Sequence, residues 1–196
     1  FTGAAPPFSR VRIQWPGGLT EERDDPYRFT PVLGDLDEHL ISEGAHRRLW
    51  EALGAHPREH EGVAGVHFAV WAPHASRVSV IGDFNAWNPA VHPMRSRGAT
   101  GVWEIFLPGL AEGAVYKFDL VGPDGETLPA KSDPLAFGSE HPPATASVVR
   151  RLGQHPWRQR LSARRRAARN AASAPISIYE VHLGSWRRVF PGGRPL

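Results

Sequence analysis

The stretch Val66-His67-Phe68-Ala69-Val70-Trp71, residues 66–71, alternates in side-chain character with a period of two. This period is typical of a β-strand, whose successive side chains point to opposite faces. Residues 77–81, 102–107 and 115–121 show the same alternation. Turn signals separate the four segments, at Ala72-Pro73, Asn88-Pro89, Pro108-Gly109 and Pro123-Asp124-Gly125. Short strands with frequent turns predict an immunoglobulin-like β-sandwich over residues 63–149, in a mainly β protein.

Residues 1–62 precede this module and have a mixed pattern. Val11-Arg12-Ile13-Gln14-Trp15 alternates like a short strand before the Pro16-Gly17-Gly18 turn. Residues 35–41 and 45–53 carry apolar side chains at helical spacing, and Gly54 is placed to end the second helix. We expect two short helices on a linker rather than a complete core.

The segment 150–175 that follows the module is basic. It contains eight arginines between residues 150 and 169, and no Asp or Glu occurs between Glu140 and Glu180. A nucleic-acid-binding arm is one interpretation. Only Trp157 could stack on a base among these arginines, so we favour a solvated helical connector and predict no nucleic-acid partner.

Residues 176–188, Ile-Ser-Ile-Tyr-Glu-Val-His-Leu-Gly-Ser-Trp-Arg-Arg, read as a buried strand that runs into a Gly-Ser turn. A buried strand needs neighbours for its backbone hydrogen bonds, and only eight residues follow. We therefore expect residues 176–196 to be the start of a further domain. The first residue is Phe1, so we expect the chain to be a piece of a longer protein at both ends.

The composition excludes several classes of site. The 196 residues include no cysteine, which rules out disulfides, thiolate nucleophiles and Cys-based zinc sites within them. No apolar run reaches the roughly 20 residues of a membrane-spanning helix, and no signal peptide is recognisable. We expect no membrane partner and a cytoplasmic location. The sequence carries no phosphate-binding or dinucleotide-binding loop, so no cofactor is expected.

The ordered motifs resemble those of bacterial 1,4-α-glucan (glycogen) branching enzymes, members of the α-amylase superfamily that carry a family 48 carbohydrate-binding module. The strand at 176–188 resembles the first strand of their catalytic barrel. Similar upstream motifs are Asp25-Pro26-Tyr27-Arg28-Phe29, Leu53-Gly54-Ala55-His56-Pro57, Phe68-Ala69-Val70-Trp71-Ala72-Pro73, Val80-Ile81-Gly82-Asp83-Phe84-Asn85-Ala86-Trp87, Val115-Tyr116-Lys117-Phe118 and Lys131-Ser132-Asp133-Pro134.

This resemblance implies the tail of an N-terminal β-domain, a complete module, and the entrance to a (β/α)₈ barrel packed against that module. It also implies transfer of an α-1,4-glucan segment to a 6-hydroxyl by retaining double displacement, which uses two carboxyl groups about 5–5.5 Å apart. In the family these carboxylates lie on later barrel strands. We therefore assign no catalytic residue here, Glu180 included, and expect the 196-residue piece alone to be inactive.

We predict glucan contact at three residues of the module, of which Trp87 and Lys117 match positions used in glucan-binding relatives. Trp87 offers an aromatic plane for the apolar face of a sugar, Lys117 offers a hydrogen-bond donor, and Asn85 offers a polar side chain nearby. Glucan-binding relatives carry a second Trp soon after the Lys-bearing strand, whereas residues 124–128 here contain no aromatic residue. The alternative is that Trp87 packs at the sandwich edge or against the barrel.

Two further patterns have structural interpretations. Trp71, Trp103 and Phe118 occupy alternating strand positions, and we predict that they belong to the core. His56-Pro57-Arg58-Glu59-His60 matches a zinc-hydrolase pattern that requires a regular helix, and the Pro and flanking Gly residues argue against one. We therefore predict no metal site.

Three functions stay open at this point. The first is a branching enzyme whose partner is an α-glucan. The second is a related trehalohydrolase or debranching enzyme, which shares the layout of module and barrel. The third is a glucan-binding or regulatory module without catalysis, although the exposed apolar strand at 176–188 would then invite aggregation.

Overall fold

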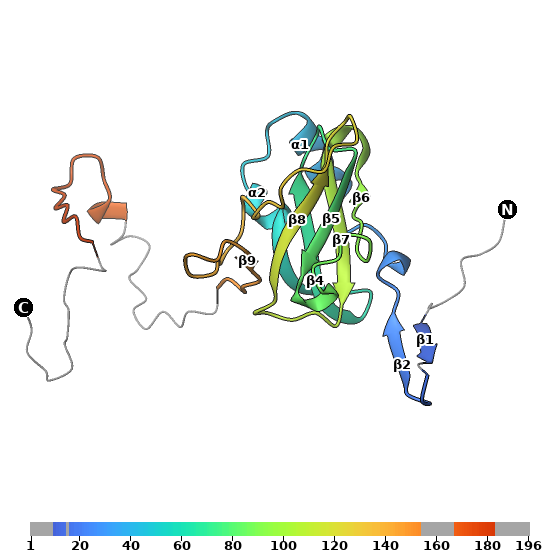
Figure 1. Ribbon diagram of the computed structural model, residues 1–196. Helices are drawn as coiled ribbons and strands as arrows, with labels where there is room; N and C mark the ends of the chain where they lie inside the picture. The colour runs from blue at the N-terminus through green and yellow to red at the C-terminus, as the bar shows by residue number, and fades with distance from the viewer. Residues whose placement is uncertain (1–9, 15, 154–166, 183–196) are drawn as a thin grey trace, which may run out of the picture. The chain divides into compact units, whose positions relative to one another are not determined.

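The computed structural model describes residues 10–14, 16–153 and 167–182 (Figure 1). The chain divides into two compact units, residues 1–154 and 155–196, which are described separately below. The first unit contains every strand that the structure describes.

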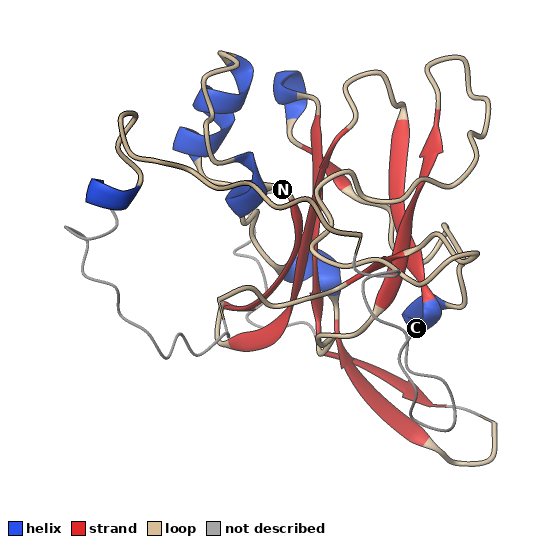
Figure 2. Cartoon of the chain, turned by 90° about the vertical axis from the view of Figure 1, so that its left-hand side faces the viewer, coloured by secondary structure: helices blue, strands red, loops and turns tan. Residues whose placement is uncertain are grey.

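The first unit is built around two antiparallel sheets (Figure 2). One sheet has the order β3-β4-β7-β6, with β3 at Gly54–His60, β4 at Val63–Trp71, β7 at Val102–Pro108 and β6 at Arg95–Ser96. The other has the order β5-β8-β9, with β5 at Arg77–Gly82, β8 at Val115–Val121 and β9 at Ser147–Val148. The four strands predicted from alternation are thus confirmed, and the fold is the expected β-sandwich.

Alternate side chains from both sheets meet in the main core. β4 contributes Val66, Phe68 and Val70, while the other strands contribute Val78, Val80, Ile105, Leu107, Tyr116 and Phe118. The rings of Phe68 and Tyr116 meet edge to face with centroids 4.9 Å apart. Phe118 is buried and Trp103 packs against the same cluster, which confirms the core positions predicted for these two aromatic residues.

The outer face of the first sheet is covered by the chain that precedes it. Helix α1 spans Asp35–Ser42 and helix α2 spans Leu49–Ala52. A second core cluster joins Leu33, Ala52 and Leu53 to Ala69 and Val102. β4 is therefore buried on both faces over most of its length.

A hairpin of β1 (Arg10–Gln14) and β2 (Thr20–Asp24) precedes this cover. The short helix η1 (Pro26–Arg28) follows, with the Asp25 carboxylate accepting a hydrogen bond of 2.9 Å from the Tyr27 N–H. The predicted helix at 45–53 is shorter than expected, because the N–H groups of Ala45 and His46 instead donate to the Leu40 carbonyl.

β3 was not predicted as a strand. Residues 54–60 pair with β4 over their whole length, so the sheet begins before the predicted boundary at residue 63. The helix that the zinc-hydrolase pattern requires is therefore replaced by a strand. Among the described residues, no three His, Asp or Glu side chains gather into an arrangement that could hold a metal ion.

The second unit is described over residues 167–182. It has one short helical turn at 167–169, and residues 176–182 form neither helix nor strand. Ile176 and Ile178 are 84% and 83% exposed. This differs from the predicted buried strand, because backbone groups form a strand only when a neighbouring strand bonds to them. Residues 183–188 of that prediction, and 154–166 of the basic connector, lie outside the described residues. Within the described ranges, no helix combines the length and apolarity needed to cross a membrane.

Candidate functional site

The turn after β5 holds Trp87 in a fixed position. The helix η2 (Asp83–Asn85) ends in two consecutive left-handed residues, Ala86 with φ 53° and Trp87 with φ 59°. This conformation costs non-glycine residues roughly 1–2 kcal/mol each. The Trp87 N–H donates to the Gly82 carbonyl at 3.0 Å, and its indole Nε1–H donates to Asp83 Oδ1 at 3.0 Å. These bonds maintain the strained turn and leave Trp87 38% exposed.

Asn85 is buried inside this turn. Its Oδ1 accepts from the Gly82 N–H at 2.9 Å, and its Nδ2 donates to the Val80 carbonyl and to His92 Nδ1, both at 3.0 Å. Burial, with a smaller contribution from Arg23, lowers the pKa of His92, so its neutral ring can accept this bond. The amide therefore braces the Trp87 turn, and the sugar contact predicted for Asn85 stays a prediction.

Lys117 lies at the same end of the β5–β8 ladder as Trp87. Its register partner is Ile81, and Gly82, which accepts the Trp87 N–H, is paired with Tyr116. The Lys117 Nζ donates to Thr145 Oγ1 at 2.7 Å. An ammonium group carries three protons, and no second bond of this group involves another described residue. Trp87 and Lys117 thus offer an aromatic surface and a donor at one end of one sheet.

A second aromatic side chain beside Lys117 is absent from the described chain around the end of β8. Residues 124–128 follow the far end of β8, where Val121 pairs with Arg77 and bridges to Thr127. The chain then returns beside Phe118, to which Lys131 bonds. The returning residues Leu128-Pro129-Ala130-Lys131-Ser132 also contain no aromatic side chain. Neither stretch therefore supplies a second ring beside Lys117.

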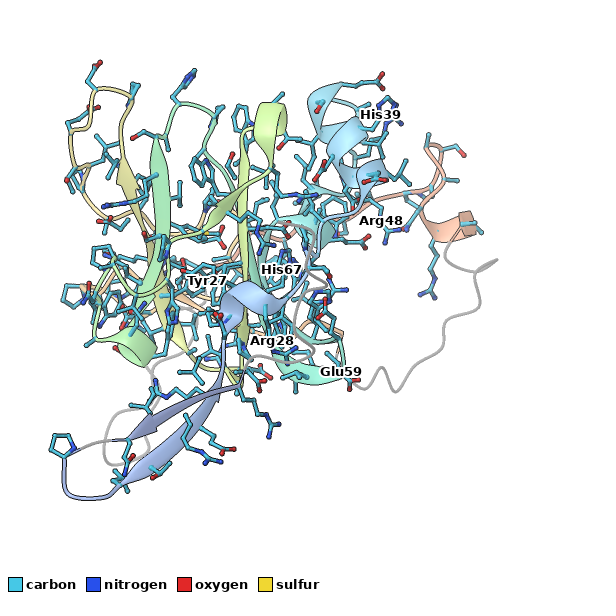
Figure 3. The ribbon with its side chains drawn as sticks, turned by 90° about the vertical axis from the view of Figure 1, so that its right-hand side faces the viewer. Tyr27, Arg28, His39, Arg48, Glu59 and His67 are labelled. Atoms are coloured by element: carbon cyan, nitrogen blue, oxygen red, sulfur yellow. The ribbon has the colours of Figure 1, made fainter. Side chains whose placement is uncertain are left out.

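A buried charged cluster lies under the cover of the first sheet. Glu104 Oε2 accepts from His67 Nε2 at 2.9 Å and from the N–H groups of Val32 and Leu33 at 3.0 Å. Arg97 Nε lies 3.1 Å from Glu104 Oε1. Figure 3 labels His67, together with Tyr27 and Arg28 of η1. The alternation pattern did not predict this cluster, although a His and a Glu within otherwise apolar strands indicate a buried polar contact.

The cluster is closed rather than open to a ligand. Burial lowers the pKa of His67, and the Glu104 contact opposes this only in part. Burial alone would raise the pKa of Glu104, but the bonds from His67 and the two backbone N–H groups lower it overall. His67 is therefore neutral and donates to an ionised Glu104, with Arg97 as the positive partner. This arrangement attaches the cover to the sheet.

Residues 52–136 match the family described as Carbohydrate-binding module 48 (Isoamylase N-terminal domain). The chain is similar to a 1,4-alpha-glucan branching enzyme GlgB of Roseobacter denitrificans, with 60% identity over 176 residues, which are 89% of this chain and 24% of the relative.

A further relative is the 1,4-alpha-glucan branching enzyme GlgB of Paramagnetospirillum magneticum. It is 59% identical over 183 residues, which cover 93% of this chain and 25% of that protein. The resemblance predicted from the ordered motifs is thus confirmed. The chain spans about a quarter of the length of the curated relatives it matches.

Solved structures of pullulanases are similar to part of the chain. The pullulanase of Klebsiella pneumoniae complexed with maltotriose gives a TM-score of 0.40 at 24% identity, over 55% of this chain and 10% of that one. The ligand-free protein from the same organism gives a TM-score of 0.42 at 25% identity, over 56% of this chain and 11% of that one.

Proposed function

We propose that this chain is part of a 1,4-α-glucan branching enzyme and that its module contacts the α-glucan. The observation that carries the proposal is 60% identity over 89% of the chain with a protein of that name. The match of residues 52–136 to a carbohydrate-binding family supports the role of the module.

The proposed reaction transfers an α-1,4-glucan segment to a 6-hydroxyl with retention of configuration. It requires a nucleophilic carboxylate and a carboxylic acid about 5–5.5 Å apart. The buried carboxylates of Glu104 and Asp133 are engaged within the module, since Asp133 accepts from the Tyr116 hydroxyl at 2.6 Å. We propose that the catalytic pair belongs to other parts of the natural polypeptide, and that residues 1–196 alone do not catalyse.

In this proposal the module positions the glucan for the rest of the enzyme. The Trp87 ring stacks against the apolar face of a glucose unit, and Lys117 donates to a hydroxyl beside it. The strained turn supports this role, because strain of this kind persists where the surrounding structure maintains it and occurs often at ligand-binding sites. Packing of the module on a catalytic barrel of the same polypeptide stays a prediction.

The activity is tested with the natural polypeptide that contains these residues. We expect incubation with amylose to create α-1,6 linkages, measured by ¹H NMR of the anomeric protons and by the chain lengths released on enzymatic debranching. The total number of reducing ends should stay constant, because each transfer breaks one glycosidic bond and makes another. Release of trehalose, or cleavage of added α-1,6 branches, would instead identify the related trehalohydrolase or debranching enzyme.

A further inference from the structure

Trp71 is exposed, whereas the other outward-facing side chains near it on β4 are covered. The outward side chains of β4 include His67, Ala69 and Trp71, which are 2%, 0% and 58% exposed. Leu33, Leu53 and Glu104 cover the first two of these, and the cover stops before the third. This corrects the core position predicted for Trp71, because strand alternation assigns a residue to a face without showing what lies over that face.

The indole of Trp71 is fixed although it is exposed. Its Nε1–H donates to the Thr100 carbonyl at 3.0 Å. The neighbouring Gly101 has φ +73°, and a Cβ added there would lie 3.1 Å from Trp71 Nε1 and 2.6 Å from Pro73 Cβ. The turn therefore needs a glycine both for its conformation and for the close approach of the ring. A ring held in this way loses little conformational entropy when a ligand binds.

Trp71 borders two grooves of different chemistry. One, of about 330 Å³, is lined mainly by apolar residues, including Ile41, Leu49 and Pro134. Its acidic group, Asp133, is occupied by the Tyr116 hydroxyl and by the Leu135 N–H at 2.8 Å. Its histidine, His46, is 3.0 Å from Asp37. This groove therefore offers little to hydroxyl groups.

The other groove, of about 250 Å³, has polar groups available at its edge. It is lined by Trp71 together with His74, Pro123, Glu126 and Leu128, among others. The side chains of His74 and Glu126 make no hydrogen bond or ion pair with other residues of the described ranges. An aromatic plane with a carboxylate and an imidazole beside it is suited to a pyranose ring, whose C–H face is apolar and whose edge carries hydroxyls.

We propose that Trp71 is a second α-glucan-binding platform, with His74 and Glu126 hydrogen-bonding the sugar that stacks on it. The ligand class rests on the proposed function, since it is the substrate of that reaction. The groove is slightly smaller than the ~300–1,000 Å³ of pockets that enclose a drug-sized ligand. It therefore suits one or two glucose units of a chain that continues into solvent.

The two platforms lie at opposite ends of the β5–β8 ladder. The Trp71 groove includes Ala75 and Leu120, close to the Arg77–Val121 pair, whereas the Trp87 turn begins at Gly82. The β5 strand has six residues from one end to the other, which is about 17 Å at ~3.3 Å per residue. One long glucan, or two branches of one polymer, could contact both platforms, which raises the apparent affinity for polymers above that for short oligosaccharides.

The test compares Trp71→Ala and Trp87→Ala in the natural polypeptide, with Trp50→Ala as the control because Trp50 is also exposed, at 46%, and borders neither platform. Affinity for soluble amylose and maltoheptaose is measured by affinity electrophoresis and calorimetry. We expect Trp71→Ala to weaken amylose binding about threefold to tenfold, from the loss of one stacking contact. Trp71→Phe should restore part of the affinity, and Trp50→Ala should change nothing.

The outcomes separate this inference from the proposed function. Unchanged amylose affinity in Trp71→Ala, with loss in Trp87→Ala, overturns the second platform and leaves the proposed function intact. If the unmodified protein binds no α-glucan, the glucan-contacting role of the module itself fails. Lower thermal stability of Trp71→Ala without a change in affinity also overturns the inference and assigns Trp71 to packing.

A second measurement decides the case if Trp71→Ala does not fold. The protein is labelled with 5-fluorotryptophan in a Trp87→Ala background, and the ¹⁹F resonance of Trp71 is assigned through Trp71→Phe. We expect maltoheptaose to shift this resonance in a saturable manner. A resonance that stays unchanged at millimolar maltoheptaose overturns the proposal.

Discussion

At the scale of single residues, the module presents its two exposed tryptophans in different ways. Trp87 is held at the tip of a strained turn through its own backbone and through Asp83, whereas Trp71 ends a strand and is held by the Thr100 carbonyl. In both, the indole N–H is bonded and much of the ring is exposed. A bonded N–H fixes the orientation of the plane, and an exposed plane can stack on a sugar.

We predict that Trp87→Ala removes glucan binding at its platform without unfolding the module. Alanine retains a Cβ, so the strain at φ 59° is unchanged, and the main losses are the ring and its bond to Asp83. Amylose affinity should fall about threefold to tenfold for the loss of one aromatic contact. The melting temperature should fall by only a few degrees, since the Trp87 side chain is not part of the core.

Lys117→Ala is the companion variant, and Trp50→Ala again serves as the control. Lys117→Ala should weaken binding by a similar factor, because a single hydrogen bond contributes about 0.5–1.5 kcal/mol, the same range as an aromatic contact. A large fall in melting temperature for Trp87→Ala, with unchanged affinity, would favour the packing alternative for this residue.

Residue types alone could predict part of this site. Trp87 and Lys117 follow from the motif, and both lie at one end of the ladder. The burial of Asn85 was not predictable, because an amide after a strand serves a turn or a ligand equally well, and the His92 contact is made by a later loop. The exposure of Trp71 was not predictable either, because it depends on how far the covering residues 29–53, which are distant in sequence, extend over the sheet.

At the scale of elements, polar contacts attach the segment that covers the first sheet, in addition to the second core cluster. The Tyr27 hydroxyl donates to the Pro93 carbonyl at 2.9 Å, and Arg95 donates to the Phe29 carbonyl at 3.3 Å. The Glu104 carboxylate accepts hydrogen bonds from the N–H groups of Val32 and Leu33. The cover thus depends on one buried carboxylate that stays ionised, and on one imidazole that stays neutral.

We predict that acidification weakens this attachment. The folded pKa of His67 lies below its ordinary value of 6.5, so below about pH 6.5 the unfolded chain binds a proton that the folded chain does not. The free energy of unfolding should fall in this range by up to about 1.4 kcal/mol per pH unit from this group. The lowered pKa of Glu104 extends the loss to pH values below its ordinary 4.5. Urea unfolding between pH 7.5 and pH 5 measures the contribution of His67, and measurements below pH 4.5 add that of Glu104.

His67→Gln supplies the control for this prediction. The glutamine amide can still donate to Glu104 but does not titrate. The free energy of unfolding of the His67→Gln variant should therefore depend less on pH than that of the unmodified chain. Equal pH dependence of the two proteins would show that other titrating groups dominate.

Strand alternation predicted the elements of the sandwich better than its cover. The four strands with clear alternation are present, whereas β3 was missed because Pro57 and the flanking glycines resemble a turn. Proline is tolerated there because β3 is the edge strand of its sheet. The near-continuous burial of β4 was hidden because its outer face is covered by residues 29–53, which are distant in sequence and weakly patterned.

At the scale of the whole molecule, both core clusters belong to the first unit. Their members lie between Leu33 and Val149. The described residues 167–182 add none of them, and the apolar side chains of that segment are largely exposed. The stability of the sandwich should therefore be determined by the first unit.

We predict that a chain ending at residue 153 unfolds with the same cooperative transition as the 196-residue chain. Differential scanning calorimetry should give melting temperatures within a few degrees of each other, because neither core cluster includes a described residue after 153. A loss of cooperative unfolding in the shorter chain would show that residues after 153 stabilise the sandwich.

The covered outer face bears on how such modules are exchanged between proteins during evolution. The family match begins at residue 52, but His67 and Glu104 are shielded by residues that come before it. A recombination event at residue 52 would transfer a sheet whose ionised carboxylate had lost two of its donors. The protein that received the module would have to provide an equivalent cover. The module should therefore be inherited together with the covering segment that precedes it. The unit that is exchanged is then longer than the domain recognised by its sequence.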